Sequence, residues 1–164
     1  MKIANRAVQA IVGMTATMLV IADAAAATCS LAAEQAAIDS RALQSELMVA
    51  ALSCGQSGQY NAFVTKFGPQ LAANGNALRQ YFGRAFGANG ETQMNAFVTR
   101  LANYASTRAT TRGTPAFCAD SAALFGQVLA AAPNDLVAVA ARQPFAGDSG
   151  ITPCAVQTAG EQPR

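Results

Sequence analysis

The side chains in this 164-residue chain that are best suited to binding chemistry are arginines. Residues 60–113 hold six cations against Glu91 alone, a net charge of +5, whereas residues 28–59 and 114–164 each carry −2. A guanidinium group offers several hydrogen-bond donors that match carboxylate and phosphate oxygens. Six residues of the basic segment are therefore candidates for binding an anion or an acidic partner: Arg79, Arg84, Arg100, Tyr104, Arg108 and Arg112.

The spacing of these residues predicts a basic helix face. Arg100, Tyr104, Arg108 and Arg112 recur every four residues, which places them on one side of a helix. Arg79 and Arg84 precede them on a separate helical segment that can add to the same surface. The alternative is a solvated face whose arginines pair with the acidic flanking segments, because surface charges often do no more than this.

The residues that are missing exclude several classes of function. The chain has no histidine, so Ser-His-Asp and Cys-His catalysis and histidine-based zinc or haem ligation are excluded. No GxxxxGK[ST] phosphate loop is present. A net charge of +1 after residue 27 is too small to favour a nucleic-acid partner. We predict no metal site, no cofactor and no catalytic residue, and consider an enzyme the less favoured alternative.

One enzymatic alternative remains, because a helical glycan-cleaving domain can use a single glutamate as its proton donor. Glu34, Glu46 and Glu91 are the internal glutamates available in the part of the chain after the predicted signal. Glu46 lies in an apolar run with Leu43 and Leu47, where partial burial favours the protonated acid. Tryptophan, which glycan clefts commonly use, is absent from the chain.

The four cysteines are interpreted as two structural disulfides. There is no C-x-x-C motif, and paired cysteines in an exported protein are usually structural. Cys29 and Cys54 bracket one predicted helix of about 36 Å, too long for a bond that needs Cα atoms within about 7 Å. Tracing an up-and-down bundle brings Cys54 to Cys118 at one end and Cys154 to Cys29 at the other. We therefore predict the pairs Cys54–Cys118 and Cys29–Cys154.

Residues 1–27 are predicted to be a cleavable export signal. Lys2 and Arg6 precede an apolar run, and three alanines at 25–27 fit an A-x-A cleavage site. The run is short for a membrane span, which needs about 20 apolar residues, although an uncleaved anchor is the alternative. The signal predicts a periplasmic or extracellular protein with no stable membrane span after cleavage.

Apolar periodicity and breaker residues predict five to six helices. The first helix, 31–53, is expected to turn Glu34, Asp39, Arg41 and Glu46 toward solvent. A break is expected near Pro69 and a turn at 74–76. The remaining predicted helices are 59–73, 77–86, one from 89 that ends before Gly113, one from 114 that Pro133 ends, and 135–142.

The sequence thus predicts an all-α, compact, disulfide-linked bundle. Its domain is expected to span 28–144, and 145–164 is expected to be an irregular tail pinned only at Cys154. The favoured function is a non-enzymatic module of the bacterial cell envelope that binds a protein partner through the basic helix face. The alternatives are a binding protein for an anionic small molecule or polymer, and a glutamate-dependent glycan-cleaving enzyme.

Overall fold

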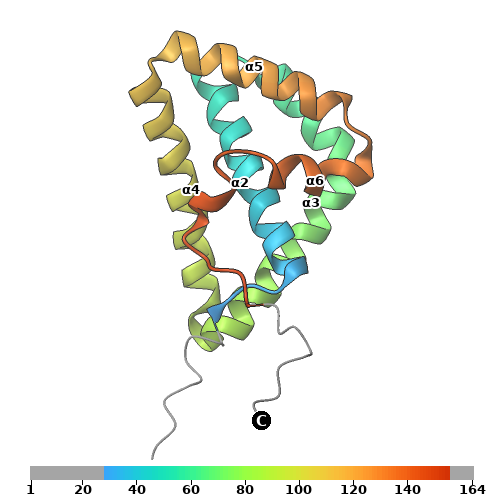
Figure 1. The fold of residues 1–164 in the computed structure, drawn as a ribbon, viewed down its shortest axis with the longest axis vertical. Helices are drawn as coiled ribbons and strands as arrows, with labels where there is room; N and C mark the ends of the chain where they lie inside the picture. Colours follow the sequence, from blue (N-terminus) through green and yellow to red (C-terminus); the bar gives the residue numbers. More distant parts are fainter. Residues whose placement is uncertain (1–27, 156–164) are drawn as a thin grey trace, which may run out of the picture.

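The structure, a computed structural model, describes residues 28–155 and confirms the all-α fold. The predicted signal at 1–27 and residues 156–164 lie outside the described residues. The described part has four long helices and the short helix α6, joined by short turns (Figure 1). The helices are α2 (Ala32–Ser53), α3 (Ser57–Phe86), α4 (Gly90–Arg112), α5 (Thr114–Ala130) and α6 (Leu136–Ala141), with 3₁₀ turns at Gly87–Asn89, Pro133–Asp135 and Ala146–Ser149.

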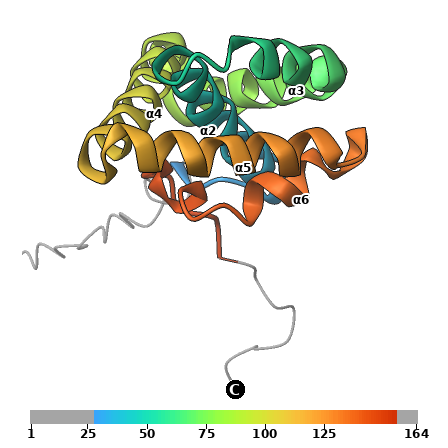
Figure 2. The same ribbon diagram turned by 90° about the horizontal axis from the view of Figure 1, so that it is seen from above.

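Helix α2 is the centre of the molecule. It contacts α3, α4, α5 and α6, and Figure 2 shows α3 and α4 on one side of it and α5 and α6 on the other. Alanine and serine are frequent in this helix, and small side chains allow neighbouring helices to approach closely. The prediction that Asp39 and Glu46 face solvent is wrong, because these side chains are only 7% and 6% exposed. A helix surrounded on several sides has no continuous face left for water.

Helix α3 is continuous from Ser57 to Phe86, so the predicted break near Pro69 and turn at 74–76 are wrong. A proline inside a helix costs one backbone hydrogen bond and strains the preceding turn. Here Phe63 and Phe67 before the proline, and Leu78 and Phe82 after it, are all buried in the same core. Their burial favours one continuous helix over two shorter ones.

Helix α5 also departs from the expected path. The up-and-down trace that was used to pair the cysteines is wrong for this helix, because Figure 1 shows α5 lying across one end of the other long helices. Phe117, Leu124, Phe125 and Val128 form its buried face. Helix α5 therefore closes the end of the bundle, where α2, α3 and α4 all contact it.

Both predicted disulfides are confirmed. Cys54 joins Cys118 with a Cα–Cα distance of 5.5 Å, and Cys29 joins Cys154 at 4.8 Å. Beside the second bond, the Ser30 amide donates to the Thr152 carbonyl at 3.0 Å and the Cys154 amide donates to the Ser30 carbonyl at 2.9 Å. Two disulfides indicate an oxidising, non-cytoplasmic environment.

The segment after α6 is held at more points than Cys154. Phe145 and Ser149 are buried, and Asp148 forms an ion pair with Arg108 of α4 at 2.7 Å. Within residues 145–155 the chain therefore packs against the helices instead of hanging from a single disulfide. No helix among residues 28–155 is long and apolar enough to cross a membrane.

Candidate anion-binding site

Three of the predicted binding arginines are engaged in ion pairs that connect separate elements. Arg84, near the end of α3, pairs with Glu34 at the start of α2 at 2.6 Å and also donates to the Cys29 carbonyl at 2.9 Å. Burial raises the pKa of Glu34, but hydrogen bonds from Arg84 and the Leu31 amide, with the charge of Arg84, outweigh it and lower that pKa. This contact holds the end of α3 against the start of α2.

Arg108 and Arg112 make the other inter-element ion pairs. Arg108 pairs with the buried Glu46 of α2 and with Asp148, and its guanidinium lies over the Phe145 ring at 5.1 Å. Arg112 pairs with Asp120 of α5 at 2.6 Å. The four acidic partners of Arg84, Arg108 and Arg112 all come from the acidic flanking segments of the sequence. These arginines therefore connect separate elements of the fold.

The six predicted residues do not line one common cavity. Arg108 and Arg112 line a hollow beneath α5, whereas Arg100 lines a separate hollow beside Tyr81 and Phe82. Tyr104 is exposed on α4. Arg79 belongs to a third hollow, between α2, α3 and α4, together with an arginine that the sequence analysis had assigned to solvent.

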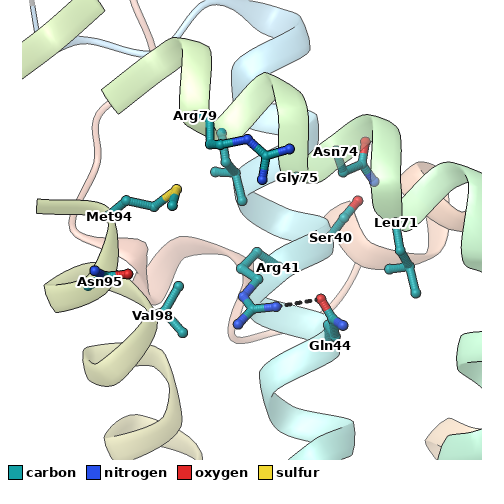
Figure 3. Close-up of a pocket in the computed structure, with 11 residues that line it drawn as sticks. Ser40, Arg41, Gln44, Leu71, Asn74, Gly75, Arg79, Met94, Asn95 and Val98 are labelled. Carbon is teal, nitrogen blue, oxygen red and sulfur yellow. Dashed lines mark hydrogen bonds between the residues drawn. The ribbon is translucent and has the colours of Figure 1, made fainter. Parts of the chain in front are cut away.

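This third hollow is the candidate site. It has a volume of about 340 Å³ and is lined by residues of three helices (Figure 3). Arg41 and Gln44 come from α2, Asn74 and Arg79 from α3, and Asn95 from α4. Apolar side chains of α3 and α4 complete the wall. They are Leu71, Leu78, Met94 and Val98.

Arg41 is the central polar residue of the cavity. It is half-buried, and its Nη1 donates to Gln44 Oε1 at 2.7 Å, while its Nε is buried without an acceptor among the described residues. Burial lowers the pKa of the Arg41 guanidinium, and the nearby Tyr60 opposes this. A guanidinium nevertheless stays charged in a protein. The cavity therefore contains a fixed positive charge with an unsatisfied donor.

Two further donors belong to the same lining. Arg79 donates from its guanidinium to Asn76 Oδ1 one helical turn earlier, and Asn74 Nδ2 is buried without a partner among the described residues. Figure 3 shows the side chains of Arg41 and Arg79 entering the space between the three helices from different helices. Buried unpaired polar atoms are rare in proteins and each needs a physical explanation. An absent acceptor, such as an anionic ligand, supplies one.

No acidic side chain lines this cavity, and in the described part of the chain neither Arg41 nor Arg79 forms an ion pair. This contrasts with Arg84, Arg108 and Arg112, each of which has a carboxylate partner. The arrangement can stabilise negative charge. The lining contains no carboxylate or thiol, and the hydroxyl of Ser40 donates to the Ala36 carbonyl at 2.8 Å.

Sequence analysis found Arg79 but missed Arg41 and Asn74. The signal that was available is the number of small apolar residues on α2, which indicates packing on several faces. When the residues before and after a cation in such a helix are buried, the cation lies next to a space between helices. Arg41, Gln44 and Met48 form the least buried stripe between Ala37 and Ala51. Asn74 gave no such signal, because it was assigned to a turn that does not exist.

Glu46 lies in a different environment from a catalytic acid. Its side chain is buried, and both of its carboxylate oxygens accept hydrogen bonds from Arg108, so the group that glycan cleavage would need as a proton donor is engaged in an ion pair that joins α2 to α4. Among residues 28–155 no group of three or more potential metal-ligating acidic, cysteine or histidine side chains is found. Comparisons with protein-family models, with curated proteins and with solved structures found no match.

Proposed function

We propose that this protein binds a small anionic ligand in the cavity between α2, α3 and α4. The observation that carries the proposal is the half-buried guanidinium of Arg41, whose Nε has no acceptor and which has no carboxylate partner among the described residues. A buried charge is costly unless it is paired. An anion that brings its own acceptors satisfies Arg41, and the exposed Arg79 of the same lining adds a second positive charge.

The proposed role is binding without chemistry. The residues that line the cavity are arginines, amides, one engaged serine and apolar side chains, with no carboxylate to act as a general base or acid. Donors that surround a fixed charge are suited to holding and orienting an anion. We further propose that the protein works in the periplasm or outside the cell, because residues 1–27 resemble an export signal and the two disulfides are consistent with it.

Calorimetric titration of the protein with inorganic phosphate, succinate and octanoate tests this proposal. At least one anion is expected to bind, and Arg41→Gln or Arg79→Gln should weaken that binding by about tenfold or more, since hydrogen bonds to charged groups are worth roughly 1.5–3 kcal/mol. The matched control is Arg100→Gln, which removes the same charge from an exposed position outside this cavity. Binding that all three variants weaken equally would mean that general surface charge, and not the cavity, attracts the anion.

A second candidate function is binding of a protein partner through the exposed part of the basic helix face. Arg100 and Tyr104 are exposed on α4, and the guanidinium of Arg100 lies over the Phe97 ring, 6.0 Å from the ring centroid. Cross-linked capture from the host, compared between the wild type and Arg100→Glu, tests it. Arg108 is unsuitable for charge reversal because it holds Glu46 and Asp148. Equal capture by both proteins removes this face as a docking surface.

A further inference from the structure

We infer that the anion bound in this cavity is a small amphiphilic monocarboxylate, with one carboxylate group and a compact apolar body of about ten non-hydrogen atoms. The inference rests on the proposed function of the cavity and names the class of ligand.

The charge of the lining selects a ligand with negative charge and no positive charge. Arg41 and Arg79 are the two ionisable groups of the lining, and no acidic side chain faces them there. A zwitterion such as a free amino acid would place its ammonium group beside two guanidinium groups with no carboxylate to receive it. Like charges at close range disfavour each other strongly in a partly buried site. Simple carboxylates avoid this cost.

A guanidinium group is also well matched to a carboxylate in shape. Its planar donors bind the two oxygens of a carboxylate side by side, which gives both affinity and orientation. The unbonded Nε of Arg41 and the unbonded Nδ2 of Asn74 are donors with no acceptor in the described part of the chain. A carboxylate has about four lone-pair sites, enough to accept from several of these donors.

The remaining wall requires an apolar body on the ligand. Leu71 and Leu78 of α3 and Met94 and Val98 of α4 line the same cavity, and Figure 3 shows Met94 and Val98 on the α4 side of it. An inorganic phosphate or sulfate would reach the guanidinium groups but would leave these side chains in contact with water. Binding sites for small molecules typically combine such an apolar lining with a few placed polar groups. Methionine adapts its shape to a ligand easily.

The volume sets the size of the body. A cavity of about 340 Å³ holds roughly eleven water-sized groups at about 30 Å³ each. Octanoate, with ten non-hydrogen atoms, and benzoate, with nine, are of this size, whereas a long-chain fatty acid is not. Each buried methylene improves binding by about fourfold. Affinity for straight-chain carboxylates should therefore rise with length up to about eight carbons and then level off or fall.

The experiment is calorimetric titration of the full chain with acetate, butyrate, hexanoate, octanoate and dodecanoate, each below its micelle concentration. Octylammonium and octanol are the charge controls. We expect affinity to rise by about sixteenfold for each two carbons up to octanoate, with no binding of octylammonium. Arg41→Gln should weaken the binding of octanoate by about tenfold or more. Val98→Thr, which replaces a methyl group by a hydroxyl, should weaken the binding of octanoate but leave the affinity for acetate unchanged.

The outcomes separate this inference from the proposed function. If phosphate or succinate binds and depends on Arg41, while octanoate binds no tighter than acetate, the cavity binds anions and the monocarboxylate assignment is wrong. If no anion binds, both proposals fail. Circular dichroism and thermal unfolding of each variant show whether it is folded. Val98→Thr, which leaves both arginines in place, still tests the apolar wall if Arg41→Gln does not fold.

Discussion

Asp39 is a buried carboxyl group without a cationic partner among the described residues. Gln35 Nε2 donates to its Oδ1 at 2.8 Å, and Gln35 Oε1 in turn accepts from Ser30 Oγ at 2.6 Å. Burial raises the pKa of Asp39, and the hydrogen bond from Gln35 opposes this only in part. The folded state therefore holds the proton of Asp39 more tightly than the unfolded state does.

This difference predicts a pH-dependent loss of stability. The contribution of Asp39 is most favourable below its unfolded pKa, near 4, and is lost as the pH rises through the higher folded pKa. Asp39→Asn keeps the shape of the side chain but cannot ionise. The melting temperature of the variant minus that of the wild type should therefore be larger at pH 7 than at pH 3. About 1 kcal/mol corresponds to roughly 4 °C in a domain of this size, so thermal unfolding resolves the effect. An equal difference at the two pH values contradicts it.

The ion pair between Arg108 and Glu46 makes a second prediction at the residue scale. Arg108→Met leaves the carboxylate of Glu46 buried with no partner, and breaking a buried pair costs about 3–5 kcal/mol. Because the Arg108 side chain is 28% exposed, we expect Arg108→Met to lower the free energy of unfolding by about 2 kcal/mol, as measured by urea unfolding. The double variant Arg108→Met, Glu46→Leu should recover much of this loss. A double variant no more stable than Arg108→Met would show that Asp148 and Phe145 provide most of the contribution of Arg108.

At the scale of elements, the sequence predicted helix ends better than helix continuity. Gly87, Gly113 and Pro133 lie where helices end, as expected, because each locally disfavours further helix. Pro69 and the residues at 74–76 carry similar local penalties, yet α3 passes through them. A local penalty of a few kcal/mol is outweighed when aromatic side chains on both sides are buried together. Sequence patterns alone give no measure of that burial.

The candidate site shows the same division between local and tertiary information. Arg79 was predicted from charge segregation, which is visible along the chain. Arg41 was missed because its role depends on α2 being surrounded by four helices. Three of the predicted arginines turned out to bind acidic side chains, an alternative that sequence analysis had left open. Only the spatial arrangement shows which cations retain no carboxylate partner.

Two helical glycines, Gly90 where α4 contacts α3 and Gly126 in α5, form a matched pair for substitution. A Cβ at Gly90 would lie 2.8 Å from the Phe82 carbonyl oxygen, whereas a Cβ at Gly126 in α5 would meet nothing within 4 Å. Gly90→Ala should therefore destabilise the protein by about 1–3 kcal/mol, since the backbone of α3 must move. Gly126→Ala should stabilise it by up to about 1 kcal/mol through helix propensity. Urea unfolding measures both, and a neutral Gly90→Ala would mean that the two helices separate easily.

At the scale of the whole molecule, two disulfides close nested loops. Cys54 and Cys118 are 64 residues apart and join the end of α2 to the start of α5, whereas Cys29 and Cys154 are 125 residues apart and join the two ends of the described chain. In the chain-entropy model the stabilisation grows only with the logarithm of loop length. The two bonds should therefore contribute nearly equally, at about 4–5 kcal/mol each as an upper estimate.

Replacing each pair of cysteines by alanine tests this expectation. Removing either bond should lower the free energy of unfolding by about 2–5 kcal/mol, with the two losses within about 1 kcal/mol of each other. The two removals should differ in their effect on the folded state. The backbone amides of residues 28–31 and 150–155 should exchange hydrogen faster when the Cys29–Cys154 bond is removed, but not when the Cys54–Cys118 bond is removed. Neither bond lines the cavity between α2, α3 and α4, so anion binding should survive in any variant that stays folded. Loss of binding in the folded Cys29→Ala, Cys154→Ala variant would show that the ends of the chain help to hold that cavity in shape.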